Sequence, residues 1–141
     1  MKSPFNLNTA NAKTFVLMLA CEGPLNFING SPVAVEPVLR NCNKKEFHHV
    51  YPRKYLAECG FGNRDMNPLV NFVVLSKADN NKLGGVKPSL YKSKMPLNEE
   101  SVRLILSKAM CPDNIFHDDY KRFTSERAGC LLRKANSLMA F

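Results

Sequence analysis

The chain has 141 residues, 45% of them hydrophobic, which is enough apolar material for the core of one domain and excludes a wholly disordered chain. Its 20 Lys and Arg residues against 12 Asp and Glu residues give a formal net charge of +8, which favours a polyanionic partner. The longest apolar run, residues 15–21, is far too short to cross a bilayer and lacks the pattern of a signal peptide, so we expect a cytoplasmic protein without a membrane segment.

The N-terminal part predicts one helix and an ordered loop. Capping residues followed by an apolar stretch with little β-branching predict a helix over residues 9–21, which Gly23 and Pro24 end. The pattern over residues 25–43 is irregular and punctuated by turn residues. We expect an ordered loop there, with a short helix over 37–40.

A strand and a short helix are predicted next. Residues 46–51 are rich in aromatic and β-branched side chains, so they predict a short strand, and Pro52 ends it because proline cannot donate to a ladder. Proline fits the first turn of a helix, which we expect over residues 53–58 with Gly60 closing it. Residues 60–68 are predicted to form a polar loop.

The second half predicts a strand followed by helices. Residues 70–76 give the strongest strand pattern, and residues 77–83 predict a helix of about two turns. Residues 87–96 are expected to be a loop, and two amphipathic helices are predicted over 99–109 and 118–136.

The positive charge is concentrated in the middle of the chain. Residues 44–94 hold ten basic and four acidic groups, whereas the segments on either side are close to neutral. A concentrated basic region favours nucleic acid as the partner, with an anionic membrane surface as the second candidate.

The five cysteines are odd in number and form no CxxC pair, which fits neither a disulfide framework nor a zinc knuckle. We expect them to be reduced and mostly buried, as small apolar side chains. They are Cys21, Cys42, Cys59, Cys111 and Cys130.

Two adjacent histidines, His48 and His49, are the most unusual residues of the sequence. On a regular strand their rings point to opposite faces, so they bind one ion only where the strand ends or bends, and Pro52 gives a reason for such an end. Asn71 begins the second predicted strand, and Asn80 falls in the helix that follows. This strand, strand and helix order can place an imidazole base beside an ion held by a second imidazole and an amide oxygen, which suits phosphodiester hydrolysis.

The segments that carry this pattern resemble the HNH nuclease domain at the C-terminus of GmrSD-type restriction endonucleases, which join a ParB-like NTPase to an HNH domain. The resemblance extends beyond the motif to segments near both ends of the chain. The similar segments are residues 25–30, 46–56, 71–76, 79–82, 87–91 and 119–127. It implies a single HNH nuclease domain over 1–141, with an α+β fold in which a ββα-metal core at about 45–84 is surrounded by α-helices.

The resemblance also implies roles for individual residues. His49 is expected to be the general base, and His48, which stands where many HNH enzymes have Asp, is expected to bind the metal. Asn80 takes the position of the second ligand, although a shift of one residue would exchange it with Asn81. Asn71 is expected to pin the loop between the strands through hydrogen bonds from its side chain to the backbone. The implied cofactor is a divalent metal, Mg²⁺ first, with Mn²⁺ or Ni²⁺ as alternatives.

Three basic side chains are candidates for contact with phosphate. Lys82 and Lys87 are close in sequence to the motif, and for each an ordinary solvated lysine is the alternative. Arg127 is similar to a late Arg of the family, and it either reaches the scissile phosphate or braces the fold. Glu46 either orients His48 or is a solvated residue at the strand end.

The resemblance implies a metal-dependent DNA endonuclease that acts as the effector of a restriction or anti-phage defence system. Full-length members carry an N-terminal nucleotide-hydrolysing domain, which nothing here resembles, so the chain is expected to be an excised C-terminal domain or a free-standing version. Two alternatives remain open. One is a non-catalytic DNA-binding or assembly module on an HNH scaffold, and the other is a structural zinc protein using Cys42, His48, His49 and Cys59.

Overall fold

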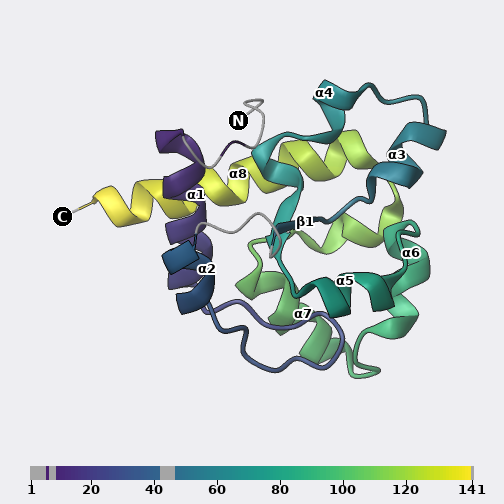
Figure 1. The fold of residues 1–141 in the computed structure, drawn as a ribbon, viewed down its shortest axis with the longest axis horizontal. Coiled ribbons are helices and arrows are strands. Elements are labelled where there is room, and N and C mark those ends of the chain that lie inside the picture. The colour runs from purple at the N-terminus through teal and green to yellow at the C-terminus, as the bar shows by residue number, and fades with distance from the viewer. Residues whose placement is uncertain (1–5, 7–8, 42–46, 141) are drawn as a thin grey trace.

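The computed structural model describes residues 6, 9–41 and 47–140, which form helices around a small antiparallel sheet. The α+β class expected from the sequence is confirmed in this general sense. The helices are α1 (Ala10–Cys21), α2 (Glu36–Asn41), α3 (Arg53–Glu58), α4 (Asn63–Met66), α5 (Lys77–Leu83), α6 (Pro88–Tyr91), α7 (Glu99–Lys108) and α8 (Tyr120–Met139), and the strands are β1 (Phe47–His49) and β2 (Phe72–Val74). Short 3-10 helices are η2 (Leu69–Asn71), η3 (Lys92–Lys94) and η4 (Asp113–His117). Figure 1 shows β1 at the centre, with α1 and α2 on one side and α3, α4 and α6 on the other.

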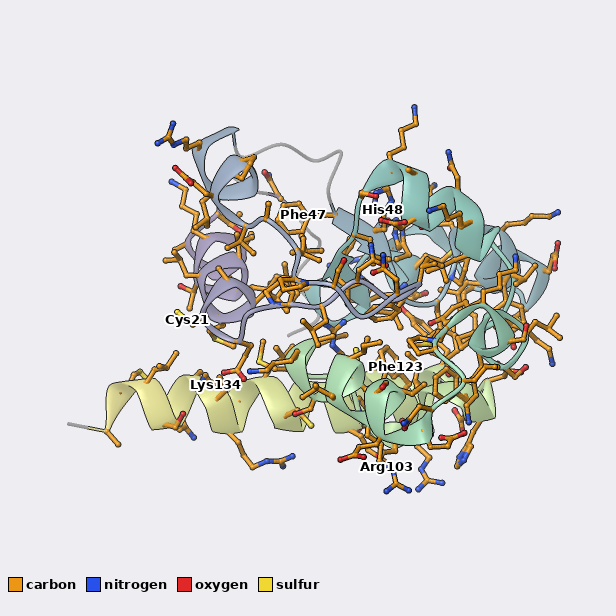
Figure 2. The ribbon with its side chains drawn as sticks, turned by 90° about the horizontal axis from the view of Figure 1, so that it is seen from below. Cys21, Phe47, His48, Arg103, Phe123 and Lys134 are labelled. Atoms are coloured by element: carbon orange, nitrogen blue, oxygen red, sulfur yellow. The ribbon has the colours of Figure 1, made fainter. Side chains whose placement is uncertain are left out.

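The register of the sheet decides which side chains share a face. β1 and β2 run antiparallel, and Phe47 pairs with Val74, His48 with Val73, and His49 with Phe72. Because successive side chains of a strand point to opposite faces, the two histidines lie on opposite sides of β1. Figure 2 labels two of these residues and shows Phe47 on the side of the strand toward α1 and His48 on the side away from it.

Each face of the sheet packs on its own hydrophobic cluster. Phe47, Phe72 and Val74 are buried together with side chains of α1 and with Leu131 of α8. Val73, on the other face, is buried together with side chains of α5, α7 and the first turns of α8. The sheet therefore separates two apolar layers, and His48 and His49 lie on faces that pack on different layers.

Helix α8 connects the two sides of the molecule (Figure 1). At its start the Tyr120 hydroxyl donates to the carbonyl of Asp65 in α4, at 2.8 Å. Near its end Lys134 forms an ion pair with Glu22, the residue after α1. Figure 2 shows Cys21, the last residue of α1, close to this part of α8.

Local signals fix several helices where the sequence predicts them. Helix α1 begins after Thr9, whose hydroxyl accepts from the backbone of Ala12, and α5 spans Lys77–Leu83, as predicted. Helix α3 also has the predicted bounds. The helices expected over 37–40, 99–109 and 118–136 form with ends shifted by no more than three residues.

The strand predicted over 70–76 is much shorter than expected. Residues 69–71 form a 3-10 helix, and the strand covers only Phe72–Val74. Asn71 N donates to the carbonyl of Pro68 at 2.9 Å and Phe72 N donates to that of Leu69, so residues 69–71 are held in a 3-10 turn and the strand begins only after it. The first strand spans only Phe47–His49, and Glu46 lies outside the described residues.

Two segments predicted as loops contain helices. α4 lies within residues 60–68, and α6 and η3 lie within 87–96. Helix α6 forms because Pro88 occupies its first turn and because Asp118, which lies 29 residues after Ser89 in the sequence, caps it. The carboxylate of Asp118 accepts from the backbone N of Ser89 at 3.0 Å and from its hydroxyl at 2.6 Å.

The expectation that the cysteines are mostly buried is wrong. The four described cysteines are free, but Cys21 and Cys59 are exposed and only Cys111 is fully buried. The exposed pair lies at the ends of helices α1 and α3, where the chain reaches the surface. Cys42 lies outside the described residues. No helix in the described part of the chain is long and apolar enough to span a bilayer.

Candidate active site

His49 is the last residue of β1, and its half-buried ring is held from two sides. It packs against Phe72 with ring centroids 4.3 Å apart, and its Nε2 lies 2.9 Å from Asn67 Oδ1. Burial lowers the pKa of His49 below its ordinary value, the nearby positive charge of Arg53 lowers this pKa further, and the hydrogen bond with Asn67 opposes the shift. The imidazole is therefore neutral at neutral pH, which is the state that a general base needs.

His48 lies on the opposite face of the strand, and its Nε2 atom is buried. Its cross-strand partner Val73 packs in the same cluster as Leu83 of α5, so His48 and α5 share this side of the sheet. Within α5, Asn80 is half-buried whereas Asn81 is exposed. Asn80 is thus the one of the two neighbouring carboxamides that lies beside the inward face of the helix.

Asn71 forms a buried joint between the end of β1 and the start of β2. Its side chain is fully buried and bonds only to backbone. Oδ1 accepts from Tyr51 N at 2.9 Å, and Nδ2 donates to the carbonyls of Tyr51 at 3.1 Å and Met66 at 3.0 Å. These are the side-chain to backbone bonds predicted for Asn71, and they fix the segment that follows His49. A part for Asn71 in catalysis stays a prediction.

Asp79 anchors α5 and was not found from the sequence. Its buried carboxylate accepts from the Ser76 hydroxyl at 2.5 Å and from Asn26 Nδ2 at 2.6 Å, and it pairs with Lys82 at 3.2 Å. The signal was present, because Ser76 and Asp79 have the spacing of a capping box at the start of α5. The contact with Asn26 joins the segment after α1 to the helix that carries Asn80.

This anchor predicts a loss of stability in acid. The hydrogen bond from Ser76 lowers the pKa of Asp79, with further lowering by Lys82 and Asn26. A carboxyl whose folded pKa lies below its unfolded value of about 3.9 stabilises the fold above that value and loses this effect as the pH falls through the folded pKa. We expect Asp79→Asn to cost about 1–2 kcal/mol at neutral pH, and the difference from wild type to shrink below about pH 4, in urea unfolding at several pH values.

The exposed Asp113 of η4 offers a matched control for that series. Asp113→Asn removes the same charge from the surface and should leave stability within about 0.5 kcal/mol at every pH. A constant difference between Asp79→Asn and wild type down to the acid end of the series would contradict the assignment.

The basic candidates differ in what they can contact. Lys82 pairs with Asp79 and Lys87 with Asp118, at 3.2 Å and 2.9 Å, and both side chains remain partly open to solvent. Arg127 is fully buried, with Nη1 donating to the carbonyl of Val70 at 2.7 Å and Nη2 to that of Ala109 at 2.9 Å. These contacts stabilise the fold, which is one of the two roles left open above. A guanidinium that is fully buried between two carbonyls does not contact phosphate.

The two expected ligands, the imidazole of His48 and the amide of Asn80, would suit an ion that keeps much of its hydration. Over residues 6, 9–41 and 47–140, no three His, Cys, Asp or Glu side chains cluster as they would around a protein-caged ion. The imidazole of His48 and the amide oxygen of Asn80 would leave most positions to water and to phosphate oxygens, as is usual for Mg²⁺ beside nucleic acids. The zinc alternative requires Cys42, which lies outside the described residues, and Cys59, which is exposed directly after α3.

No protein-family model, no curated protein and no solved structure matches the chain.

Proposed function

We propose that this chain is a divalent-metal-dependent DNA endonuclease of the HNH type, with β1, β2 and α5 as its ββα unit. The observation that carries the proposal is the joint made by Asn71, whose side chain bonds to the backbone of Tyr51 after β1 and of Met66 before β2, beside the half-buried ring of His49. Because the buried amide of Asn71 bonds to backbone groups, its role is to position the residues beside it. One of these is His49, whose imidazole is suited to accept a proton.

The chemistry assigned to His49 is proton removal from water. The water proton moves to the imidazole, the water oxygen forms a bond to phosphorus, and the bond from phosphorus to the leaving oxygen breaks as that oxygen takes a proton from solvent. A divalent ion bound by His48 and Asn80 would stabilise the negative charge that builds on the phosphate.

Exposed cations on the helices that adjoin β1 and β2 in the sequence would suit a phosphate backbone. They lie on α3, α4 and α5, and they are Arg53, Lys54, Arg64, Lys77 and Lys82. Binding through such groups weakens as salt rises, with a slope of about 0.9 in log affinity per phosphate neutralised in duplex DNA. The sequence resemblance supports the wider proposal that the chain is a cytoplasmic effector of a restriction or anti-phage system, paired with an NTPase or sensor domain.

The direct test is cleavage of supercoiled plasmid by the purified protein. We expect nicked or linear product with Mg²⁺ and none with excess chelator, and Mn²⁺ and Ni²⁺ are tested in parallel. DNA binding that weakens with salt, with no cleavage under any of the three ions, would instead indicate a non-catalytic DNA-binding module.

Removing either proposed ligand should raise the metal requirement. We expect His48→Ala and Asn80→Ala to need about tenfold or more Mg²⁺ for half-maximal cleavage, because each removes a donor from a site with few protein ligands. Asn81→Ala is the matched control on the same helix and should leave the requirement unchanged. If Asn81→Ala rather than Asn80→Ala shows the effect, the second ligand lies one residue further along α5.

A further inference from the structure

A chain of four polar side chains runs from the surface of α3 to the ring of His49. Arg53 Nη2 donates to Asn63 Oδ1 at 3.0 Å. Asn67 Nδ2 donates to the same Asn63 Oδ1 at 3.0 Å and to the Asn63 carbonyl at 2.6 Å. Asn67 Oδ1 in turn lies 2.9 Å from His49 Nε2. Asn63 and Asn67 lie outside the segments that carry the resemblance, and Arg53 lies inside one of them but was given no role there.

In this series of hydrogen bonds, the groups at the two ends decide which atom donates and which accepts. A guanidinium can only donate, so the Asn63 atom that faces Arg53 is the oxygen. A backbone carbonyl can only accept, so the Asn67 atom 2.6 Å from the Asn63 carbonyl is the amide nitrogen. The opposite orientation of Asn67 would set two acceptors against each other at that distance. The Asn67 oxygen therefore faces the imidazole, and an oxygen requires a donor there.

We propose that Asn67 is a positioning residue that holds the proton of neutral His49 on Nε2 and leaves Nδ1 as the nitrogen that takes the proton from water. The part concerning water rests on the proposed function, whereas the position of the proton rests on the hydrogen bonds alone. Imidazole tautomers are set in this way wherever the second ring nitrogen has a fixed partner.

The position of Asn67 is itself fixed by the joint that Asn71 makes. Asn67 follows directly after α4, and the carbonyl of Met66, the last residue of α4, accepts from Asn71 Nδ2 at 3.0 Å. Met66 is buried, so the end of α4 is held by packing as well. The buried amide of Asn71 thus fixes both the backbone after His49 and the position of Asn67, which orients the ring of His49.

The position of the proton can be measured without any reaction. In long-range proton–nitrogen NMR spectra of ¹⁵N-labelled wild type, above the pH at which imidazoles titrate, we expect His49 Nε2 to carry the proton and that proton to be protected from exchange with water. In Asn67→Ala the protection should be lost, while Asn136→Ala, at an exposed position of α8, should match wild type. His49→Gln assigns the signals. A proton on Nδ1 in the wild type, or unchanged protection in Asn67→Ala, overturns the inference.

The plasmid assay adds a readout that separates this inference from the proposed function. We expect Asn67→Ala to lower kcat by about 10–100-fold with little change in KM for DNA, because Asn67 acts through the imidazole. Cleavage by a wild type whose proton is on Nδ1 overturns the inference and leaves the proposed function standing. Absence of cleavage by a wild type with a protected Nε2 proton overturns the proposed function, and with it the assignment of Nδ1 to water, but leaves the role of Asn67 in fixing the tautomer supported.

Discussion

Replacing His49 with alanine is expected to lower Mg²⁺-dependent plasmid cleavage by about 10²–10⁴-fold, the range that a positioned general base contributes. The reason is that the neighbouring imidazole of His48 lies on the opposite face of β1 and cannot take its place. Initial rates of nicking at saturating Mg²⁺ measure the effect. DNA binding by the variant should remain within a few-fold of wild type, because His49 carries no charge in its working state.

The chain offers a matched control for that experiment in His117, which is exposed at the end of η4. His117→Ala should cleave at the wild-type rate. Because His49 packs on Phe72, circular dichroism and a thermal melt must first show that His49→Ala is folded. Full activity in a folded His49→Ala protein would refute the assignment of the base.

Asn71→Ala is expected to cause the largest loss of stability among these variants, about 3 kcal/mol or more. Removing the amide leaves three buried backbone groups without their partners, and each such group costs about 1–3 kcal/mol. Urea unfolding followed by circular dichroism gives the difference in free energy of unfolding. Cleavage should fall as well in whatever fraction stays folded, since the segment after His49 loses its tie to β2.

The comparison for this variant is Asn136→Ala, which removes the same group from an exposed position of α8. It should change the free energy of unfolding by no more than about 0.5 kcal/mol. A loss below about 1 kcal/mol for Asn71→Ala would mean that water satisfies the three backbone groups, and the joint would then hold His49 only weakly.

The sequence predicts those helices whose ends depend on neighbouring residues. Thr9, Ser76, Asn98 and Asp119 cap α1, α5, α7 and α8 through their own side chains, and each has the usual capping type. The left-handed Gly84 ends α5 for the same local reason. Helices α4 and α6 were missed because their supports come from far along the chain. Tyr120 of α8 bonds to Asp65 in the first, and Asp118 caps the second.

The same division applies to the candidate site. The bonding of Asn71 was predicted from its place in the motif, and the structure confirms those bonds. Asn67 is not marked by any pattern, since only the fold brings it within hydrogen-bond distance of the His49 ring. For Arg127 the sequence left two roles open, and the burial of its guanidinium between two carbonyls decides for the brace.

Arg127 lies on α8 between Phe123, which belongs to one apolar cluster, and Leu131, which belongs to the other. Its two hydrogen bonds reach η2 before β2 on one side and the residue after α7 on the other. If either half of the interior melts alone, the guanidinium therefore loses one of its two carbonyl partners while the other half still encloses its charge. Heating should consequently produce one cooperative unfolding transition. A destabilising substitution in the apolar cluster beneath α1 should also destabilise the cluster at the start of α8.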